Sequence, residues 1–185
     1  MFRPPLPAPG LAAATLLWVI LDQAAKLLVV WHGLVGPAPV IPGFFDLLYR
    51  ENRGGAWGLF AGAPEWFRMP FFVCSSLAAV AFLVWLRRRM AIRRPWVDWA
   101  FPAILGGAVG NLLDRVRLGY VIDFIDWHVA GAHWPTFNVA DVGITVGVAL
   151  LVFDSLFDPR SAATAEGAGR AAGTEEAPPG PPGEG

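Results

Sequence analysis

The stretch FFVCSSLAAVAFLVWLRRR, residues 71–89, decides the fold class of this chain. Sixteen residues without a charged side chain are followed by three consecutive arginines. The apolar segment that ends here begins near residue 67, so it approaches the roughly 20 residues that an α-helix needs to cross a bilayer. This stretch therefore predicts a membrane-spanning helix that ends in a positively charged loop.

The composition extends this interpretation to the whole chain of 185 residues. Hydrophobic residues make up 55% of it and charged residues 16%, whereas a soluble domain carries about a quarter charged residues. The net charge of −1 predicts no nucleic-acid partner. Cys74 is the sole cysteine, so the chain forms no internal disulfide.

Four apolar segments predict an all-α membrane protein with four transmembrane helices, at about residues 11–30, 67–86, 96–113 and 137–157. We expect them to form one membrane domain that covers residues 1–160. The third segment is the shortest and is rich in glycine, which favours close contact with another helix. Residues 161–185 are mostly Ala, Gly, Pro and Glu and predict a disordered cytoplasmic tail.

Arginines between the second and third segments predict the orientation of the helices. Five of them lie within residues 87–94, and loops rich in Lys and Arg face the cytoplasm. Both termini are then cytoplasmic, and residues 31–66 and 114–136 lie on the outer side. Four tryptophans lie in or next to these outer segments, as expected for an aromatic belt at the outer membrane–water interface. They are Trp31, Trp66, Trp127 and Trp134.

One of the outer segments, residues 35–60, lacks a helical pattern. Short apolar runs in it alternate with Pro42, Gly43 and the turn-forming run 52–55 (NRGG). Such a pattern is typical of short strands joined by turns. We therefore expect a small extramembrane β-sheet cradle on the outer face, resting on the helices.

Four polar clusters interrupt the apolar segments, and the predicted topology places them toward the outer face. They are Asp22 with Lys26, residues 52–56 (NRGGA), Asn111 with Asp114 and Arg115, and residues 138–141 (NVAD). Asp22 and Lys26 are four residues apart, so they can pair on one helix face. Arg115 beside Asp114 favours the charged form of that carboxyl, which predicts a positioning role rather than proton transfer.

Asp123 and Asp141 stand apart because neither has a basic residue within four positions. Placing a carboxylate inside the membrane costs roughly 2.5–3.5 kcal/mol on insertion scales, so its presence there indicates a function. Two carboxylates in one partly desolvated site share a proton, so one activates water while the other donates to a scissile carbonyl. This chemistry needs no metal. The alternative is that each aspartate merely caps a helix, with Asp141 near the start of the fourth span.

Two further alternatives remain at this point. His128 and His133 lie near Asp126 and make a metal site conceivable, but a spacing of five misaligns two ligands on a helix, and we expect no metal. A non-enzymatic carrier could use membrane carboxylates for proton coupling. A carrier should show polar residues through the depth of several spans, whereas here they gather near one face, which favours a site at an interface.

The order of the polar blocks resembles that of a known family. The blocks are residues 22–26 (DQAAK), 52–56 (NRGGA), 110–115 (GNLLDR) with 121–124 (VIDF), and 137–141 (FNVAD). Over about residues 11–157 the chain resembles lipoprotein signal peptidase (signal peptidase II), a bacterial membrane enzyme that cleaves signal peptides from prolipoproteins. Gly55 and Trp57 differ from the Ala and Phe that are common in the family.

The resemblance implies an aspartic endopeptidase of the bacterial plasma (inner) membrane, with Asp123 and Asp141 as its catalytic dyad at the outer face. The substrate would be a prolipoprotein whose cysteine after the signal peptide carries diacylglyceryl, cut just N-terminal to that cysteine, with its acyl chains among membrane lipid. Residues that bind substrate or support the dyad would be Asp22, Lys26, Asn52, Gly54, Asn111, Asp114, Arg115, Asn138 and Ala140. No cofactor is implied, and one chain can build the site, so we expect a monomer.

Overall fold

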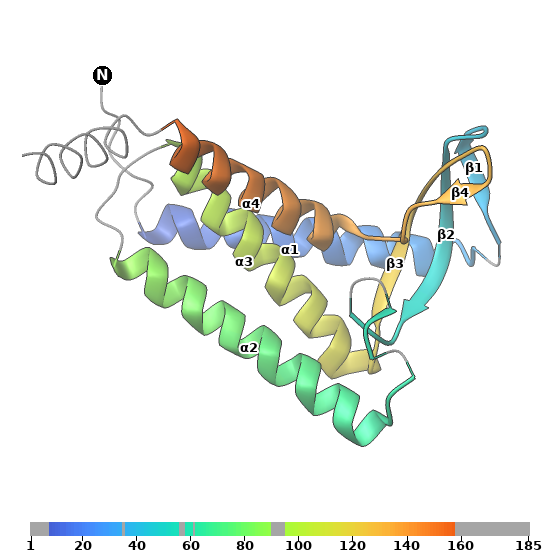
Figure 1. The fold of residues 1–185 in the computed structure, drawn as a ribbon, viewed down its shortest axis with the longest axis horizontal. Coiled ribbons are helices and arrows are strands. Elements are labelled where there is room, and N and C mark those ends of the chain that lie inside the picture. The colour runs from blue at the N-terminus through green and yellow to red at the C-terminus, as the bar shows by residue number, and fades with distance from the viewer. Residues whose placement is uncertain (1–7, 35, 56–57, 61, 90–94, 158–185) are drawn as a thin grey trace, which may run out of the picture. The chain divides into compact units, whose positions relative to one another are not determined.

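A computed structural model describes residues 8–34, 36–55, 58–60, 62–89 and 95–157. The helices are α1 (Ala8–Trp31), α2 (Glu65–Arg89), α3 (Pro95–Leu118) and α4 (Val139–Leu156). The strands are β1 (Ala38–Ile41), β2 (Phe45–Asn52), β3 (Val121–Val129) and β4 (Ala132–His133). Figure 1 shows α1, α2 and α3 running alongside one another, with the strands gathered at one end. The predicted tail, residues 161–185, and Trp57 lie outside the described residues.

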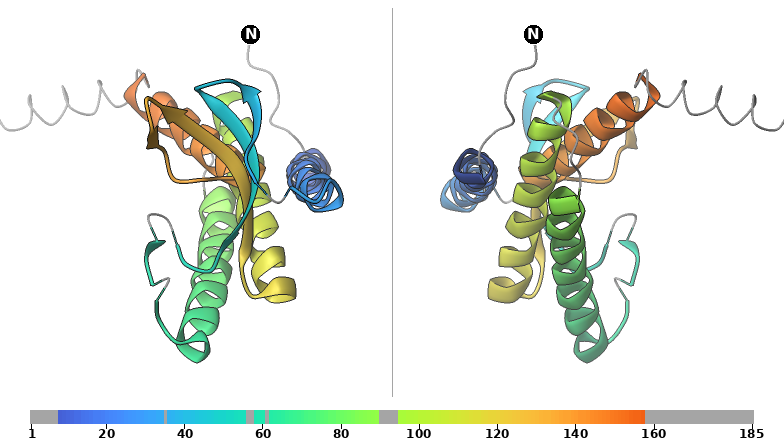
Figure 2. Two further views of the ribbon diagram at one scale, coloured as in Figure 1. Left: turned by 90° about the vertical axis from the view of Figure 1, so that its right-hand side faces the viewer. Right: turned by 90° about the vertical axis from the view of Figure 1, so that its left-hand side faces the viewer.

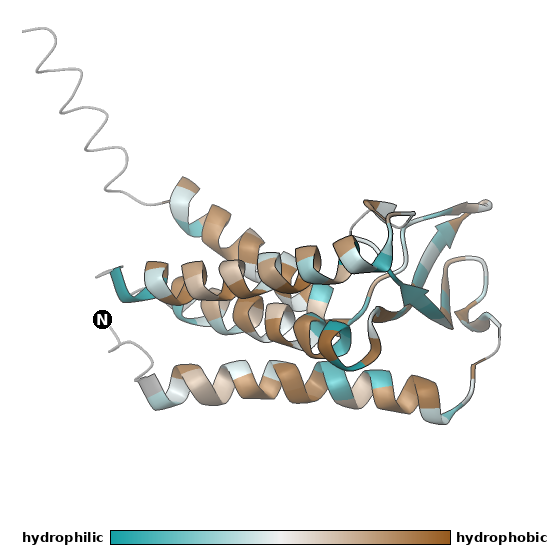
Figure 3. Cartoon of the chain, turned by 90° about the horizontal axis from the view of Figure 1, so that it is seen from below, coloured by the Kyte–Doolittle hydropathy of each residue, from teal (hydrophilic) through white to brown (hydrophobic). Residues whose placement is uncertain are grey.

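Three helices in the described part of the chain, α1, α2 and α4, are long and apolar enough to cross a membrane. Large apolar side chains on them remain exposed, such as Leu16, Leu27 and Phe82, and Figure 3 shows hydrophobic residues along most of their surfaces. So much exposed apolar surface is unusual for a soluble monomer and is typical of helices in lipid. The third predicted span corresponds to α3, which is 24 residues long but carries Asp98, Asp114, Arg115 and Arg117.

Helix α3 forms the core of the bundle. Its first half buries Val97, Ala100 and Phe101 almost completely. Its glycines allow neighbouring helices to approach closely, because a Cβ atom at Gly106 would collide with Trp18 of α1 and one at Gly107 would collide with Ala140 of α4. The prediction that the glycine-rich third segment makes helix contacts is therefore confirmed, and it explains why this helix needs less apolar surface than the others.

Replacing Gly107 with Ala should separate α3 from α4. The new Cβ would collide with the carbonyl oxygen of Ala140 and would lie 2.8 Å from Cγ1 of Ile144, and overpacking of this kind costs typically about 1–3 kcal/mol. We expect a lower unfolding midpoint in detergent and a displaced Asp141, because Ala140 immediately precedes Asp141. Gly62→Ala is the control, since no atom of the described residues, apart from its chain neighbours, lies within 4 Å of a Cβ there. Equal stability of the two variants would contradict the close packing.

The four strands form one antiparallel sheet in the order β1-β2-β3-β4. In the left view of Figure 2, the end of the molecule that carries this sheet faces the viewer. Strands were predicted for residues 35–60, where β1 and β2 lie, but β3 and β4 were not predicted. Their hairpin turns at Ala130 and Gly131, with φ of 51° and 82°, as a type I′ turn requires. A bulge between Leu47 and Arg50 of β2 shifts the register against β3.

Candidate active site

Asp123 and Asp141 line the same cleft, which has a volume of about 1130 Å³. Asp123 lies on β3, and Asp141 lies in the first turn of α4. The walls come from β2 and the following loop, β3, the end of α3, and α4 with the segment that leads into it. They include Arg50, Asn52, Gly54, Arg115, Trp127, Phe137, Val142 and Val146. The fold therefore brings the two predicted carboxylates to one site, although 17 residues separate them in sequence.

Two asparagines hold the carboxylate of Asp123, which is only 1% exposed. Asn138 donates from Nδ2 to Oδ1 at 2.7 Å, and Asn52 donates from Nδ2 to Oδ2 at 2.9 Å. Because both oxygens accept a hydrogen bond from a different element, the carboxylate is fixed relative to both β2 and α4. Such fixed orientation is what a catalytic group requires.

Asp141 is both part of the site and part of a helix cap. Its backbone N–H donates to Oδ1 of Asn138 at 3.0 Å, and its Oδ2 accepts from the backbone N–H of Asn138 at 3.3 Å. This reciprocal pair is a capping box, with Asn138 at the N-cap of α4. Oδ1 of Asp141 also accepts from Nδ2 of Asn111 at 2.9 Å. The capping alternative and the functional interpretation are thus compatible, and the N-cap residue itself is Asn138.

The environment of Asp123 favours its neutral form. Burial raises the pKa of its carboxyl to about 7, and the nearby charge of Asp141 acts in the same direction. The hydrogen bonds from Asn52 and Asn138 oppose this rise, because they stabilise the carboxylate. Near neutral pH the two aspartates can therefore hold one proton between them, as a general acid–base pair needs.

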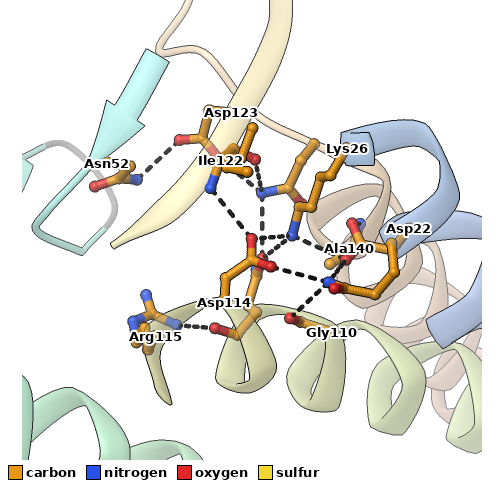
Figure 4. Close-up of polar contacts among 12 residues, drawn as sticks. Asp22, Lys26, Asn52, Gly110, Asp114, Arg115, Ile122, Asp123 and Ala140 are labelled. Atoms are coloured by element: carbon orange, nitrogen blue, oxygen red, sulfur yellow. Dashed lines mark hydrogen bonds and ion pairs between the residues drawn. The ribbon is translucent and has the colours of Figure 1, made fainter. Parts of the chain in front are cut away.

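Lys26 lies behind the dyad, 2% exposed, and is surrounded by acceptors (Figure 4). Its Nζ is 2.8 Å from Oδ2 of Asp22 and 2.8 Å from Oδ2 of Asp114, and it donates to Oδ1 of Asn111 at 3.0 Å. The predicted pair of Asp22 with Lys26 is present. The lysine also reaches α3, so one buried ammonium group joins α1 to α3.

The two carboxylates that contact Lys26 also bind the backbone next to each dyad residue. Oδ1 of Asp22 accepts from the N–H of Ala140 at 2.8 Å, and Oδ2 of Asp114 accepts from the N–H of Ile122 at 3.2 Å. Ala140 precedes Asp141, and Ile122 precedes Asp123. Asp22 and Asp114 therefore position the chain segments that carry the dyad, and this is the supporting geometry that the sequence predicted only in outline.

Arg115 acts on Asp114 through its charge, and no direct ion pair joins the two among the described contacts. In the described contacts the strong partner of Asp114 is Lys26, whereas Arg115 donates to the carbonyl oxygen of Asn111 at 3.4 Å and lies 5.1 Å from the ring of Phe72. Adjacent helix residues point in different directions, so the described direct partner of Asp114 is Lys26 rather than Arg115. Arg115 lines the cleft instead, where its positive charge faces the carboxylates.

The loop after β2 closes another wall of the cleft. Oδ1 of Asn52 accepts from the backbone N–H of Gly54 at 3.0 Å, an Asx-turn that orients the amide of Asn52 toward Asp123. Gly55, where the family commonly has Ala, lies so close to α2 that a Cβ atom would be 3.0 Å from the ring of Phe72. Gly54 itself lines the cleft.

The histidines, for which the sequence predicted no site, come together on the sheet. His128 and His133 are directly opposite each other in the β3–β4 hairpin, with ring centroids 4.8 Å apart. On a helix, residues five apart point in different directions, but in a hairpin two residues with an odd separation can lie directly opposite each other. Asp126 and Asp46 of β2 complete the group. Asp46 was not predicted, because nothing in the sequence indicates the β2–β3 register.

Comparisons with known proteins identify the family. The family model described as signal peptidase (SPase) II matches residues 14–157. A lipoprotein signal peptidase from Ralstonia nicotianae is 43% identical over 140 residues, which cover 76% of this chain and 80% of that protein. One from Desulforapulum autotrophicum is 46% identical over 145 residues, covering 76% and 87%. A solved structure of a bacterial membrane enzyme, 30% identical, aligns with a TM-score of 0.73 over 85% of this chain and 99% of its own. The chain that builds this carboxylate cleft belongs to the signal peptidase II family.

Proposed function

We propose that this protein is an aspartic endopeptidase that removes signal peptides from diacylglyceryl-modified prolipoproteins, cutting just N-terminal to the lipidated cysteine. Membership in the family supports the substrate class. The observation that carries the chemistry is that Asp123 and Asp141 line one cleft, with asparagines holding each carboxylate. Water is the nucleophile in this proposal, and the proton that the two carboxylates share is moved between water, the scissile carbonyl and the departing amine.

The two carboxyl groups divide the proton transfers between them as a general acid and a general base. The carboxylate that is charged takes a proton from water as the water attacks the scissile carbonyl, while the protonated partner donates to the carbonyl oxygen. When the C–N bond breaks, the carboxyl that took the water proton donates it to the nitrogen of the departing cysteine, and its partner recovers a proton from a hydroxyl of the tetrahedral intermediate as the carbonyl re-forms. Because the two groups titrate together, the pair as a whole carries the proton. In this proposal Lys26, Asp22 and Asp114 position the dyad. Their hydrogen bonds go to Asn111 and to the backbone N–H groups of Ala140 and Ile122, which adjoin Asp141 and Asp123.

Apolar side chains around the cleft suit a lipidated substrate in the membrane. Trp127, Phe137, Val142 and Val146 line it together with the polar groups, and burial of acyl chains contributes about 0.8 kcal/mol for each CH₂ group. We propose that a monomer holds the substrate's acyl chains among membrane lipid, with the peptide bond at the dyad.

In the proposed arrangement all four helices, α3 included, cross the bacterial plasma (inner) membrane. The sheet lies on the outer face, and both termini are in the cytoplasm. Helix α3 can cross lipid despite its charges because Asp114 faces Lys26, and Asp98 pairs with Arg87 of α2 at 2.7 Å. The exposed Trp31, Trp66 and Trp127 belong to the sheet end of the helices or to the sheet, where interfacial aromatics are expected.

The substrate is tested by incubating the purified full-length protein with one prolipoprotein in two forms, lipidated and unlipidated, and measuring product masses. We expect cleavage of the lipidated form, with the lipid-bearing cysteine as the first residue of the larger product. The unlipidated form should be cut far more slowly. Equal rates for both forms, or a cut at another peptide bond, would contradict the proposed substrate.

Activity should decline as the pH rises through about 7, because the pKa of Asp123 is raised to about 7 and the dyad then loses its shared proton. The raised pKa also means that the folded state holds a proton that the unfolded chain releases, so this group's contribution to stability is lost as the pH rises from about 4 to about 7.

Asn52→Ala removes a hydrogen bond that lowers the pKa of Asp123, so it should move the decline in kcat/KM to higher pH. An unchanged or lower midpoint would disprove the coupling between Asn52 and Asp123.

A further inference from the structure

Four titratable side chains form a second cluster on the sheet, apart from the dyad. They are Asp46 of β2, Asp126 and His128 of β3, and His133 of β4. Side chains alternate between the two faces of a strand, so Asp126 and His128 lie on the face of β3 opposite to Asp123. Register brings the others to the same face, because Asp46 is paired with Asp126 and His133 with His128. Of these four side chains, His133 also lines the cleft of the dyad, whereas the other three are not among the described residues that line it.

The atoms of this cluster are close enough to hold one ion. One possible ligand atom from each of Asp46, Asp126 and His128 lies within 4.8 Å of the others. A zinc ion with ligand bonds of about 2.1 Å holds its ligand atoms roughly 3.4 Å apart. Movement on the order of 1 Å, which side-chain rotation can supply, would close the group around a metal ion.

The electrostatics of the cluster favour a cation. Asp46 and Asp126 face each other directly across the β2–β3 pair, a position in which like charges destabilise a sheet. Their side chains are 15% and 5% exposed, so water screens this repulsion poorly. Two carboxylates at such a short separation attract a divalent ion, which would neutralise their charge.

The bonding of the histidines indicates where the ion would sit. Nε2 of His128 is buried and has no hydrogen-bond partner in the described part of the chain, although it lies 3.2 Å from Oδ2 of Asp46. A buried nitrogen that faces a carboxylate without forming a hydrogen bond is in the position of a metal ligand. His133 contacts both carboxylate oxygens of Asp126 through Nδ1, at 2.9 and 3.1 Å, and can orient that carboxylate as an outer partner.

We propose that Asp46, Asp126 and His128 bind a divalent transition-metal ion of the zinc type, which clamps β2 to β3 behind the active-site cleft. One imidazole with two carboxylates suits such an ion better than calcium, which prefers oxygen ligands alone. The ion has a structural role here: it stabilises the sheet that carries Asp123 and takes no part in hydrolysis.

The test uses the full-length, tag-free protein in detergent after removal of metals by a chelator. Zinc should bind with a stoichiometry of one per chain in calorimetry and raise the thermal unfolding midpoint, whereas calcium should do neither. Cobalt(II) should give the visible absorption of a low-coordinate nitrogen–oxygen site. His128→Gln and Asp46→Asn should abolish these signals, and His133→Gln should weaken zinc binding by roughly 10- to 100-fold. His32→Gln, which changes the third histidine at the exposed end of α1, is the matched control and should bind like the original protein.

Failure of this proposal is distinguishable from failure of the proposed enzyme. Asp123→Asn should still bind zinc, because it lies on the other face of β3. If the cluster consists only of two His–Asp ion pairs, zinc will show no saturable binding, and the proposal is wrong. Binding that survives in His128→Gln and Asp46→Asn, or that disappears in His32→Gln, would equally overturn it. Should His128→Gln fail to fold, Asp46→Asn and the cobalt spectrum decide the question.

Discussion

Lys26→Met should unfold far more easily than the original protein and should lose activity. The substitution keeps most of the side-chain volume but leaves Asp22 and Asp114 buried without their shared cation, and breaking a buried ion pair in this way costs about 3–5 kcal/mol. Both carboxylates accept hydrogen bonds from the backbone next to the dyad, so their displacement should also disturb Asp123 and Asp141. Reversible unfolding in mixed detergent, followed by tryptophan fluorescence, measures the loss.

Two further variants separate charge from packing in this prediction. Adding Asp22→Asn and Asp114→Asn to Lys26→Met removes the unpaired charges, so much of the lost stability should return while activity remains low. Arg53→Met breaks an exposed ion pair with Glu51 and should scarcely change the free energy of unfolding, because such pairs are weak. If Lys26→Met is no less stable than Arg53→Met, the buried ammonium group does not hold α1 to α3.

Asp141→Asn and Asp123→Asn should each lower the rate of cleavage by at least ~10³-fold, near the upper range for loss of a general acid or base. An amide has nearly the same shape but can neither take nor supply the proton. Asp141→Asn also retains one oxygen that can accept from Asn138, so α4 should still begin at the same residue. Asp141→Ala, in contrast, removes both the chemistry and the cap, and should lower stability by a further amount of about 1 kcal/mol.

That contrast distinguishes the two interpretations of Asp141. A residue that only caps the helix should give a stability defect with Ala, little defect with Asn, and enzymatic activity that follows stability. A catalytic residue should lose activity in both variants, whatever their stability. Circular dichroism and thermal unfolding of both proteins provide the comparison.

The sequence predicts well those features that depend on local pattern. The apolar runs correspond to α1, α2 and α4, and the i,i+4 spacing of Asp22 and Lys26 corresponds to a real ion pair. The run of turn residues after β2 marks the loop at the cleft. In each case the interaction is decided by neighbours within one helical turn or one β-turn, so the spacing of the residues contains the information.

Features that depend on contacts between distant segments could not be predicted in the same way. Lys26 reaches Asp114 across 88 residues, and no local pattern distinguishes it from Arg115 as the partner of that carboxylate. Asp46 meets Asp126 through a register that a bulge in β2 displaces. Strand β3 alternates imperfectly between apolar and polar residues, since Val121, Ile122 and Phe124 are all buried, so no clear two-residue period marks it as a strand.

The most direct test of the dyad is a single-turnover experiment with Asp123→Asn in excess over a lipidated prolipoprotein, read by mass spectrometry. Excess enzyme makes the result independent of substrate affinity and product release, so the measured rate is that of peptide-bond cleavage. We predict that the variant binds the substrate, unfolds at nearly the same temperature as the original protein and forms no product while the original protein completes its turnover. Cleavage at a near-normal rate by folded Asp123→Asn protein would contradict the assignment of Asp123 and Asp141 as the catalytic pair.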